Sequence, residues 1–153
     1  MSNFMKLTTC FVLFEATMLA SVHNLYASDK RTDVIVSARN HDLSISVVND
    51  SGQFVSGSNA FCVAFTRAAT AYPVSVKNVD VEFAQQVGRI QERPTRAQIA
   101  ENDIGSFCGR VDFGTQNDQP ASYYIFVRYT EASGTRRRCR FLLVIKPEKA
   151  VRK

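Results

Sequence analysis

The chain has 153 residues, of which 45% are hydrophobic and 22% are charged, and its formal net charge is +5. These proportions exclude a disordered or collagen-like chain, and the length favours one domain with a single hydrophobic core. The aromatic residues are eleven Phe and five Tyr, with no Trp.

The first 27 residues have the order of a secretory signal peptide. Lys6 gives a positive start, an apolar run spans residues 7–20, and a more polar stretch precedes a cut site after Ala27. We therefore predict a signal helix in residues 1–27 that is removed on export, and a periplasmic or secreted mature protein. The alternative is that residues 7–20 anchor the protein to the inner membrane. That run contains Glu15 and is shorter than the roughly 20 apolar residues that span a bilayer.

Residues 28–41 are predicted as an N-terminal extension, and residues 147–153 as a charged tail. Between them, short runs of alternating apolar and polar residues are separated by turn residues, a pattern typical of half-buried strands. The polar stretch 85–94 is predicted as a loop. The predicted strands are 42–48, 60–67, 74–83, 96–100 (a strand or a helical turn), 106–113, 123–129 and 138–146.

Seven strands at regular spacing predict an all-β fold, a single immunoglobulin-like β-sandwich over residues 42–146. An antibody-type domain would carry a Trp packed against a disulfide between its sheets. Because this chain has no Trp, the prediction concerns the architecture and not the antibody family.

Several short motifs follow one another in this segment: Gly57-Ser58-Asn59 with Phe61, Val63 and Phe65, then Tyr72-Pro73-Val74, then Gly105 with Phe107, then the aromatic strand 123–129. In this order they resemble the YtkA-like/FixH-like domain, a small bacterial extracytoplasmic β-sandwich. The resemblance implies a copper-handling or oxidase-assembly accessory role as an alternative function. Such domains often have a methionine-rich loop, whereas the loop here, VGRIQERPTR, has neither Met nor His. No metal site and no cofactor are therefore predicted.

Three cysteines remain after the predicted cleavage. Alternation places Cys62 and Cys108 on the outward faces of two strands that are neighbours in the assumed sandwich, so we predict a disulfide between them. The alternative is that all three cysteines are reduced. Cys139 has the phase of Phe141 and Leu143 and is predicted to be a buried free thiol. A thiol-dependent assembly role through Cys139 is a further alternative function.

The positive charge is concentrated at the C-terminal end. Residues 136–153 hold eight basic residues against Glu148, a local charge of +7. We predict that the arginines protect an edge strand from aggregation, with a peripheral contact to anionic lipid as the alternative. No nucleic-acid-binding motif is present, so no nucleic-acid partner is predicted. The basic patch comprises Arg136, Arg137, Arg138 and Arg140.

No motif in the sequence indicates catalysis. His41 is the sole histidine after residue 27, and nucleophile-elbow, phosphate-loop and dinucleotide motifs are absent from the sequence. Asp80 and Glu82 alternate with apolar residues, as on a solvated sheet face. We therefore predict an exported non-enzyme that binds or supports a protein partner in the cell envelope. The candidate interaction residues are Arg89, Gln91, Glu92, Arg93 and Arg96 in the loop, and Tyr123, Tyr124 and Tyr129 in the aromatic strand.

Overall fold

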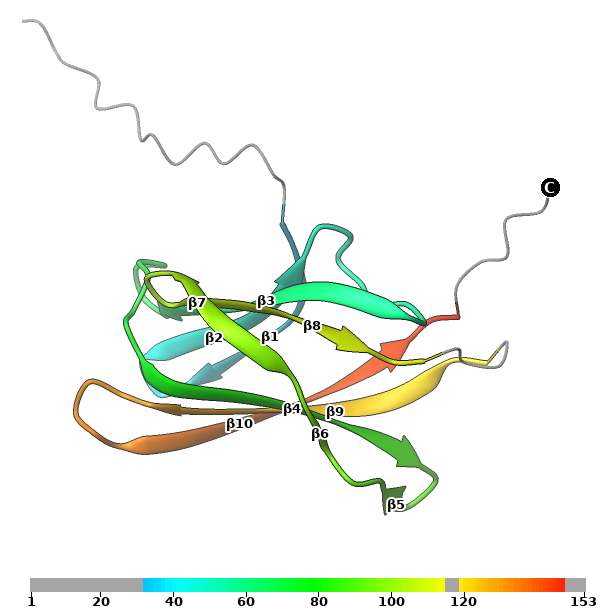
Figure 1. Cartoon of the computed structure of the whole chain (residues 1–153). Helices are drawn as coiled ribbons and strands as arrows, with labels where there is room; N and C mark the ends of the chain where they lie inside the picture. The colour runs from blue at the N-terminus through cyan, green and yellow to red at the C-terminus, as the bar shows by residue number, and fades with distance from the viewer. Residues whose placement is uncertain (1–31, 115–118, 148–153) are drawn as a thin grey trace, which may run out of the picture.

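The computed structural model describes residues 32–114 and 119–147, which form two β-sheets packed face to face (Figure 1). The first sheet has the strand order β1–β2–β3–β8–β7. The second has the order β10–β9–β4–β5, with β6 also paired to β4. The predicted signal helix and residues 148–153 lie outside the described residues. The strands are β1 (Asp33–Asn40), β2 (Leu43–Asn49), β3 (Ser58–Arg67), β4 (Lys77–Val87), β5 (Ile90–Gln91), β6 (Thr95–Arg96), β7 (Gln98–Asp103), β8 (Ser106–Asp112), β9 (Ala121–Thr130) and β10 (Arg136–Ile145).

The strand order confirms the predicted immunoglobulin-like sandwich. In immunoglobulin domains, strands A, B, E and D form one sheet and strands C, F and G the other. Here β2, β3, β8 and β7 occupy the A, B, E and D places, and β4, β9 and β10 occupy the C, F and G places. The extra strand β1 extends the first sheet beyond the A position.

Part of the predicted N-terminal extension is in fact the strand β1. It pairs antiparallel with β2, and the tight turn between them holds His41 with a φ of 54°. Its alternation is hidden because Val34, Ile35 and Val36 follow one another and a bulge lies between Val34 and Val36. An edge strand is held mainly by backbone pairing and does not require a regular apolar face. The alternation of apolar residues therefore did not predict this strand.

Two further predictions need correction in the segment that connects β4 to β8. Residues 85–94 are not a plain loop, because β4 continues to Val87 and the short strand β5 pairs back onto it. The predicted strand or helical turn at 96–100 is the strand β7, which starts at Gln98 and runs to Asp103. Both segments are polar because they lie at sheet edges, where the backbone is paired while the side chains face solvent.

The core between the sheets is filled by aromatic and branched side chains from both inner faces. Phe54, in the segment before β3, lies among Phe61, Phe83 and Phe113, whose ring centres are 6.0, 5.9 and 5.3 Å from its own. Each of these contacts is edge to face, the geometry that aromatic quadrupoles favour. The other large, fully buried side chains are Ile45, Val47, Val63, Phe65, Val81, Ile125, Val127, Tyr129 and Ile145.

The first sheet is cross-linked by the Cys62–Cys108 disulfide, as predicted. The two residues lie directly opposite each other on β3 and β8, and their Cα atoms are 4.0 Å apart. Their neighbours Phe61, Val63 and Phe107 face the core, so the disulfide lies on the outer side of the sheet. The loop that it closes spans 46 positions of the chain.

Candidate binding surfaces

The outer face of the second sheet brings several arginines and two aromatic rings together. On β9, Ile125 and Val127 face the core, which places Tyr124, Phe126 and Arg128 on the opposite face. Strand pairing places β4 on one side of β9 and β10 on the other. We call this surface the arginine face and define it by Asp80, Glu82, Tyr124, Phe126, Arg128, Arg138 and Arg140.

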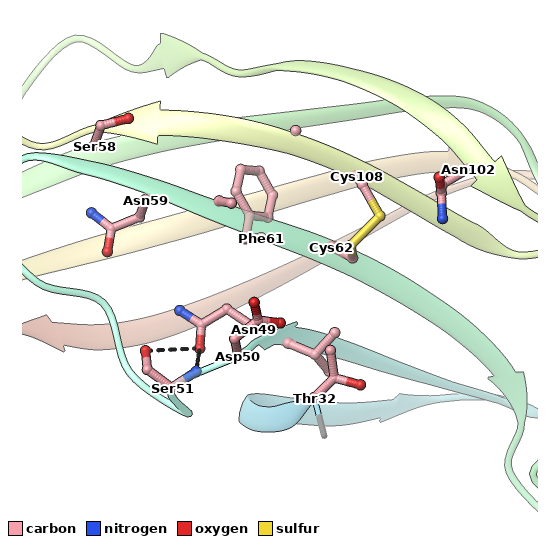
Figure 2. Close-up of a pocket in the computed structure, with 13 residues that line it drawn as sticks. Thr32, Asn49, Asp50, Ser51, Ser58, Asn59, Phe61, Cys62, Asn102 and Cys108 are labelled. Atoms are coloured by element: carbon pink, nitrogen blue, oxygen red, sulfur yellow. Dashed lines mark hydrogen bonds between the residues drawn. A yellow bond between two sulfur atoms is a disulfide. The ribbon is translucent and has the colours of Figure 1, made fainter. Parts of the chain in front are cut away.

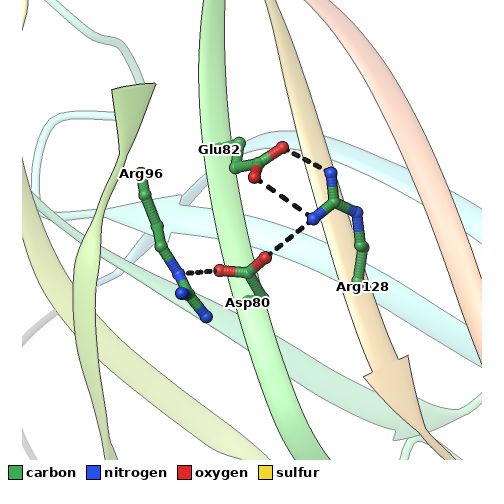
Figure 3. Close-up of polar contacts among 4 residues, drawn as sticks. All are labelled: Asp80, Glu82, Arg96 and Arg128. Atoms are coloured by element: carbon green, nitrogen blue, oxygen red, sulfur yellow. Dashed lines mark hydrogen bonds and ion pairs between the residues drawn. The ribbon is translucent and has the colours of Figure 1, made fainter. Parts of the chain in front are cut away.

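One half of the arginine face consists of a cluster of ion pairs (Figure 3). Arg128 donates to Asp80 at 3.0 Å, and to both carboxylate oxygens of Glu82 at 3.1 and 2.6 Å. Arg96, on the short strand β6, pairs with the other oxygen of Asp80. Asp80 and Glu82 are thus not simply solvated, because each is half-buried and paired across strands. The cluster joins β6, β4 and β9.

Arginines from β10 cover the aromatic rings of the other half. The guanidinium carbon of Arg138 lies 4.4 Å from the ring centre of Phe126, and that of Arg140 lies 5.0 Å from the ring centre of Tyr124. Phe126 is only 3% exposed although it is on an outer face, in keeping with the guanidinium that lies over it. Such cation–π contacts hold the guanidiniums in place at the surface.

The predicted tyrosine surface is wrong for two of its three residues. Tyr123 and Tyr129 are buried in the core, where the Tyr123 hydroxyl lies 3.2 Å from Gln85 Oε1 and the Tyr129 hydroxyl accepts a hydrogen bond from Asn40 at 3.1 Å. Tyr124 alone lies on the outer face. The phase of β9 decides this, because residues two apart on a strand share a face and both 123 and 129 have the core phase.

The predicted basic patch is divided by the same alternation. Arg136, Arg138 and Arg140 are exposed on the outer face of β10, whereas Arg137 has the opposite phase and pairs with Glu131 at 3.1 Å. β10 is the last strand of its sheet, so the prediction that these arginines lie on an edge strand is confirmed.

The predicted interaction loop forms the tip of the β4–β5 hairpin, at the far edge of the same sheet from β10 (Figure 1). Gly88 turns the chain with a φ of 59°, and Gln86 donates to the Gly88 carbonyl at 2.7 Å. Two apolar side chains are exposed there, Val87 at 50% and Ile90 at 71%. The predicted residues Arg89, Gln91, Glu92, Arg93 and Arg96 are all exposed in this segment.

A hollow of about 600 Å³ lies beside the disulfide, between the end of β2 and the β7–β8 pair (Figure 2). Two of the amide side chains that line it, Asn49 and Asn59, form hydrogen bonds within their own turns. Asn49 accepts hydrogen bonds from the Ser51 backbone and hydroxyl at 3.0 and 3.2 Å, and Asn59 donates to the Val55 carbonyl at 2.7 Å. These bonds shape the loops around the hollow.

Cys139 is a free thiol on β10, but it is half-buried and not fully buried as predicted. It has the core phase and packs against the edge of the core, near the start of the strand. Burial raises the pKa of the Cys139 thiol, so the thiolate is disfavoured.

Residues 32–114 and 119–147 contain no helix with the length and hydropathy needed to cross a membrane. In the same part of the chain, no three or more His, Cys, Asp or Glu side chains are placed to bind a metal ion together.

Comparisons with known proteins concern the fold alone. The sequence matches no protein-family model, and no curated protein matches it. A DUF4785 family protein from Legionella pneumophila is 14% identical in its solved structure, with a TM-score of 0.49, over 69% of this chain and 29% of that one. Murine CRIg is 12% identical, with a TM-score of 0.40, over 63% of this chain and 89% of that one. Likenesses this distant carry no indication of function, and the resemblance to the YtkA-like/FixH-like domain stays a prediction.

Proposed function

We propose that the protein is an exported, non-catalytic β-sandwich that serves as a binding or accessory module for another component of the cell envelope. Two features support export. Residues 1–27 have the order of a signal peptide, and the first sheet is closed by a disulfide of the kind that persists in oxidising compartments. The absence of catalytic motifs from the sequence supports a non-catalytic role, and His41 is exposed in the β1–β2 turn.

The tip of the β4–β5 hairpin is the observation that carries the proposed contact with a partner. It combines exposed Val87 and Ile90 with the arginines Arg89 and Arg93. Apolar side chains surrounded by arginine are typical of the centre of a protein–protein interface. A short paired hairpin also presents them on a firm base, so little conformational entropy is lost on binding.

Photo-crosslinking in the source cells tests this contact. A photoreactive residue is placed at Ile90, and at Tyr72 as the matched control, because the two positions are 71% and 72% exposed and lie in different segments of the chain. We expect a discrete crosslinked protein from position 90 and none of that size from position 72. Identical crosslinking patterns from the two positions would contradict the assignment of the hairpin.

Arginine substitutions test the same contact by affinity. Arg89→Ala with Arg93→Ala should reduce recovery of the crosslinked partner, whereas Arg39→Ala with Arg110→Ala removes the same charge from the first sheet and should not. Export is tested separately by the mass of the protein from fractionated cells. Uncleaved protein in the cytosol with Cys62 and Cys108 reduced would contradict it.

A further inference from the structure

The outer edge of β10 offers an unpaired strand with a regular pattern of side chains. Among the described residues, the β10 ladder pairs with β9 alone, and β10 ends its sheet. The edge is bounded just beyond the strand, where Lys146 forms a parallel bridge with Val55, and β1 of the first sheet packs close to β10. Its exposed side chains follow one another at every second position along ten residues. Leu142 and Val144 are 57% and 54% exposed. From the start of the strand to its end, these side chains are Arg136, Arg138, Arg140, Leu142 and Val144.

The three arginines of this row carry charge that the rest of the described structure does not offset. Arg128 and Arg96 are paired with carboxylates, but Arg136, Arg138 and Arg140 form no ion pair within residues 32–114 and 119–147. Arg138 and Arg140 are also positioned in advance, since each lies over an aromatic ring. Both rings belong to β9, so the two guanidiniums are held over the face of the sheet, and a carboxylate of an added strand must reach them there.

We propose that the β10 edge binds an extended acidic segment of a partner protein, which adds to the second sheet as a further strand. Side chains two apart on a strand are about 6.8 Å apart, so acidic residues at alternate positions of such a segment match Arg136, Arg138 and Arg140. Two apolar residues at the next alternate positions match Leu142 and Val144. Directly opposed side chains of opposite charge stabilise the pairing of neighbouring strands.

A hollow beside the start of β10 lies on the face of the sheet, over β9 and β4, next to Arg136 and Arg138. The hollow measures about 430 Å³ and is lined by Arg128, Arg136 and Arg138, with Asn78 at its side. Asp80 also lines it, but its carboxylate is held by Arg96 and Arg128. The potential in the hollow therefore favours an anion.

The same pattern argues against a second copy of the chain at this edge. Pairing β10 with another β10 sets each exposed arginine opposite arginine, Leu142 or Val144, and never opposite a carboxylate. Such a row repels its own copy and accepts an acidic strand. This site goes beyond the proposed contact at the β4–β5 hairpin and does not depend on it, because the two lie at opposite edges of the sheet.

Fluorescence anisotropy with the full-length protein tests the proposal. The probe is a labelled eleven-residue peptide, TVTVTETETET, and the control peptide carries Lys in place of each Glu. We expect the Glu peptide to bind and the Lys peptide not to bind. Arg138→Glu with Arg140→Glu should weaken binding of the Glu peptide at least about tenfold. Arg39→Glu with Arg110→Glu makes the same charge change on the first sheet and should leave binding within about twofold.

A conservative variant keeps the test valid if charge reversal disturbs folding. Arg138→Lys with Arg140→Lys retains the charge and should retain the preference for the Glu peptide, with thermal unfolding as the check on the fold. Equal binding of the Glu and Lys peptides by the natural protein would overturn the proposal.

Backbone methylation separates strand addition from simple charge attraction. Two Glu peptides carry N-methyl groups at one or the other set of alternate residues. Strand addition predicts that only one of the two loses binding, because only one set of amides points toward β10. Equal binding of both peptides would overturn the added strand. Binding to phosphatidylglycerol vesicles without binding to the Glu peptide would also overturn the proposal, in favour of a lipid surface.

Discussion

Asp80 on β4 and Arg128 on β9 stand 48 positions apart in the chain and are joined by a hydrogen-bonded ion pair of 3.0 Å on the outer face of the second sheet. The two residues are register partners, and the next pair along the same strands, Val81 and Val127, is completely buried. One face of this strand pair thus packs in the core, and the other face forms a charged surface.

The Asp80–Arg128 pair should contribute modestly to stability. The Arg128 side chain is 46% exposed, so solvent screens the attraction, and exposed pairs are worth about 1 kcal/mol or less. A double-mutant cycle with Asp80→Ala and Arg128→Ala, measured by denaturant unfolding, should give a coupling free energy of that size that falls with added salt. Coupling that is several-fold larger and insensitive to salt would contradict this account.

The disulfide should stabilise the fold far more than that ion pair. Closing a loop of 46 positions removes conformational entropy from the unfolded chain, which corresponds to about 4 kcal/mol in the entropic model. Cys62→Ala with Cys108→Ala should therefore lower the free energy of unfolding by about 2–4 kcal/mol. Cys139→Ala is the control, because it removes a cysteine that forms no disulfide. An equal loss in the control would show that lost packing, and not the cross-link, is responsible.

Phe54 should be among the most costly side chains to truncate. It is 1% exposed and contacts the rings of Phe61, Phe83 and Phe113 although it belongs to no strand. Phe54→Ala should lower the free energy of unfolding by about 3–5 kcal/mol, since it leaves a cavity and removes the edge-to-face contacts. Phe54→Leu keeps most of the volume and should cost less. Similar unfolding midpoints for Phe54→Ala and the natural protein would contradict this central position.

Substitution of Gly105 should destabilise the fold for two reasons, and Gly134 is a control that separates them. It has a φ of +68°, and a Cβ at this position would lie 2.5 Å from the Val74 carbonyl oxygen and 2.8 Å from that of Phe65. Gly134 also has a positive φ, +85°, but a Cβ there would meet nothing within 4 Å. Gly105→Ala should therefore destabilise more than Gly134→Ala, which carries only the backbone strain of about 1 kcal/mol. Equal thermal shifts would rule out the close contact at Gly105.

Stability should decline at alkaline pH because of two groups at the β9–β10 end. Burial raises the pKa of the Cys139 thiol, and burial together with Glu131 raises the pKa of the Tyr129 hydroxyl. Above the unfolded-state pKa values, about 8.5 and about 10, the folded state binds more protons than the unfolded state. The stabilisation that these neutral groups give is present at lower pH and is lost as the pH rises through their folded-state values.

Denaturant unfolding as a function of pH checks this expectation. Cys139→Ser should flatten the first part of the alkaline decline, and Tyr129→Phe the part above about pH 10. Tyr72→Phe is the control, because Tyr72 is 72% exposed and outside the core. An alkaline decline that is unchanged in both test variants would contradict the role given to these groups.

The sequence by itself was sufficient for the class of fold and for the disulfide. A period of two is a local property of a strand, so Leu43, Ile45 and Val47 identify their core face without reference to any partner strand. The same phase rule placed Cys62 and Cys108 outward, and the assumed strand order made them neighbours. Each of these inferences needs only residues within a few positions of one another and one standard topology.

Only the tertiary structure decided which residues meet across the sheets. Asp80, Arg96 and Arg128 form one cluster because β6 and β9 flank β4, and no local pattern contains that register. Local alternation separates Tyr124 from Tyr123 and Tyr129, but only the packing of the first sheet shows that the face with Tyr123 and Tyr129 is the buried one. Local periodicity shows that a strand has two faces, but pairing and packing between distant segments determine what each face contacts.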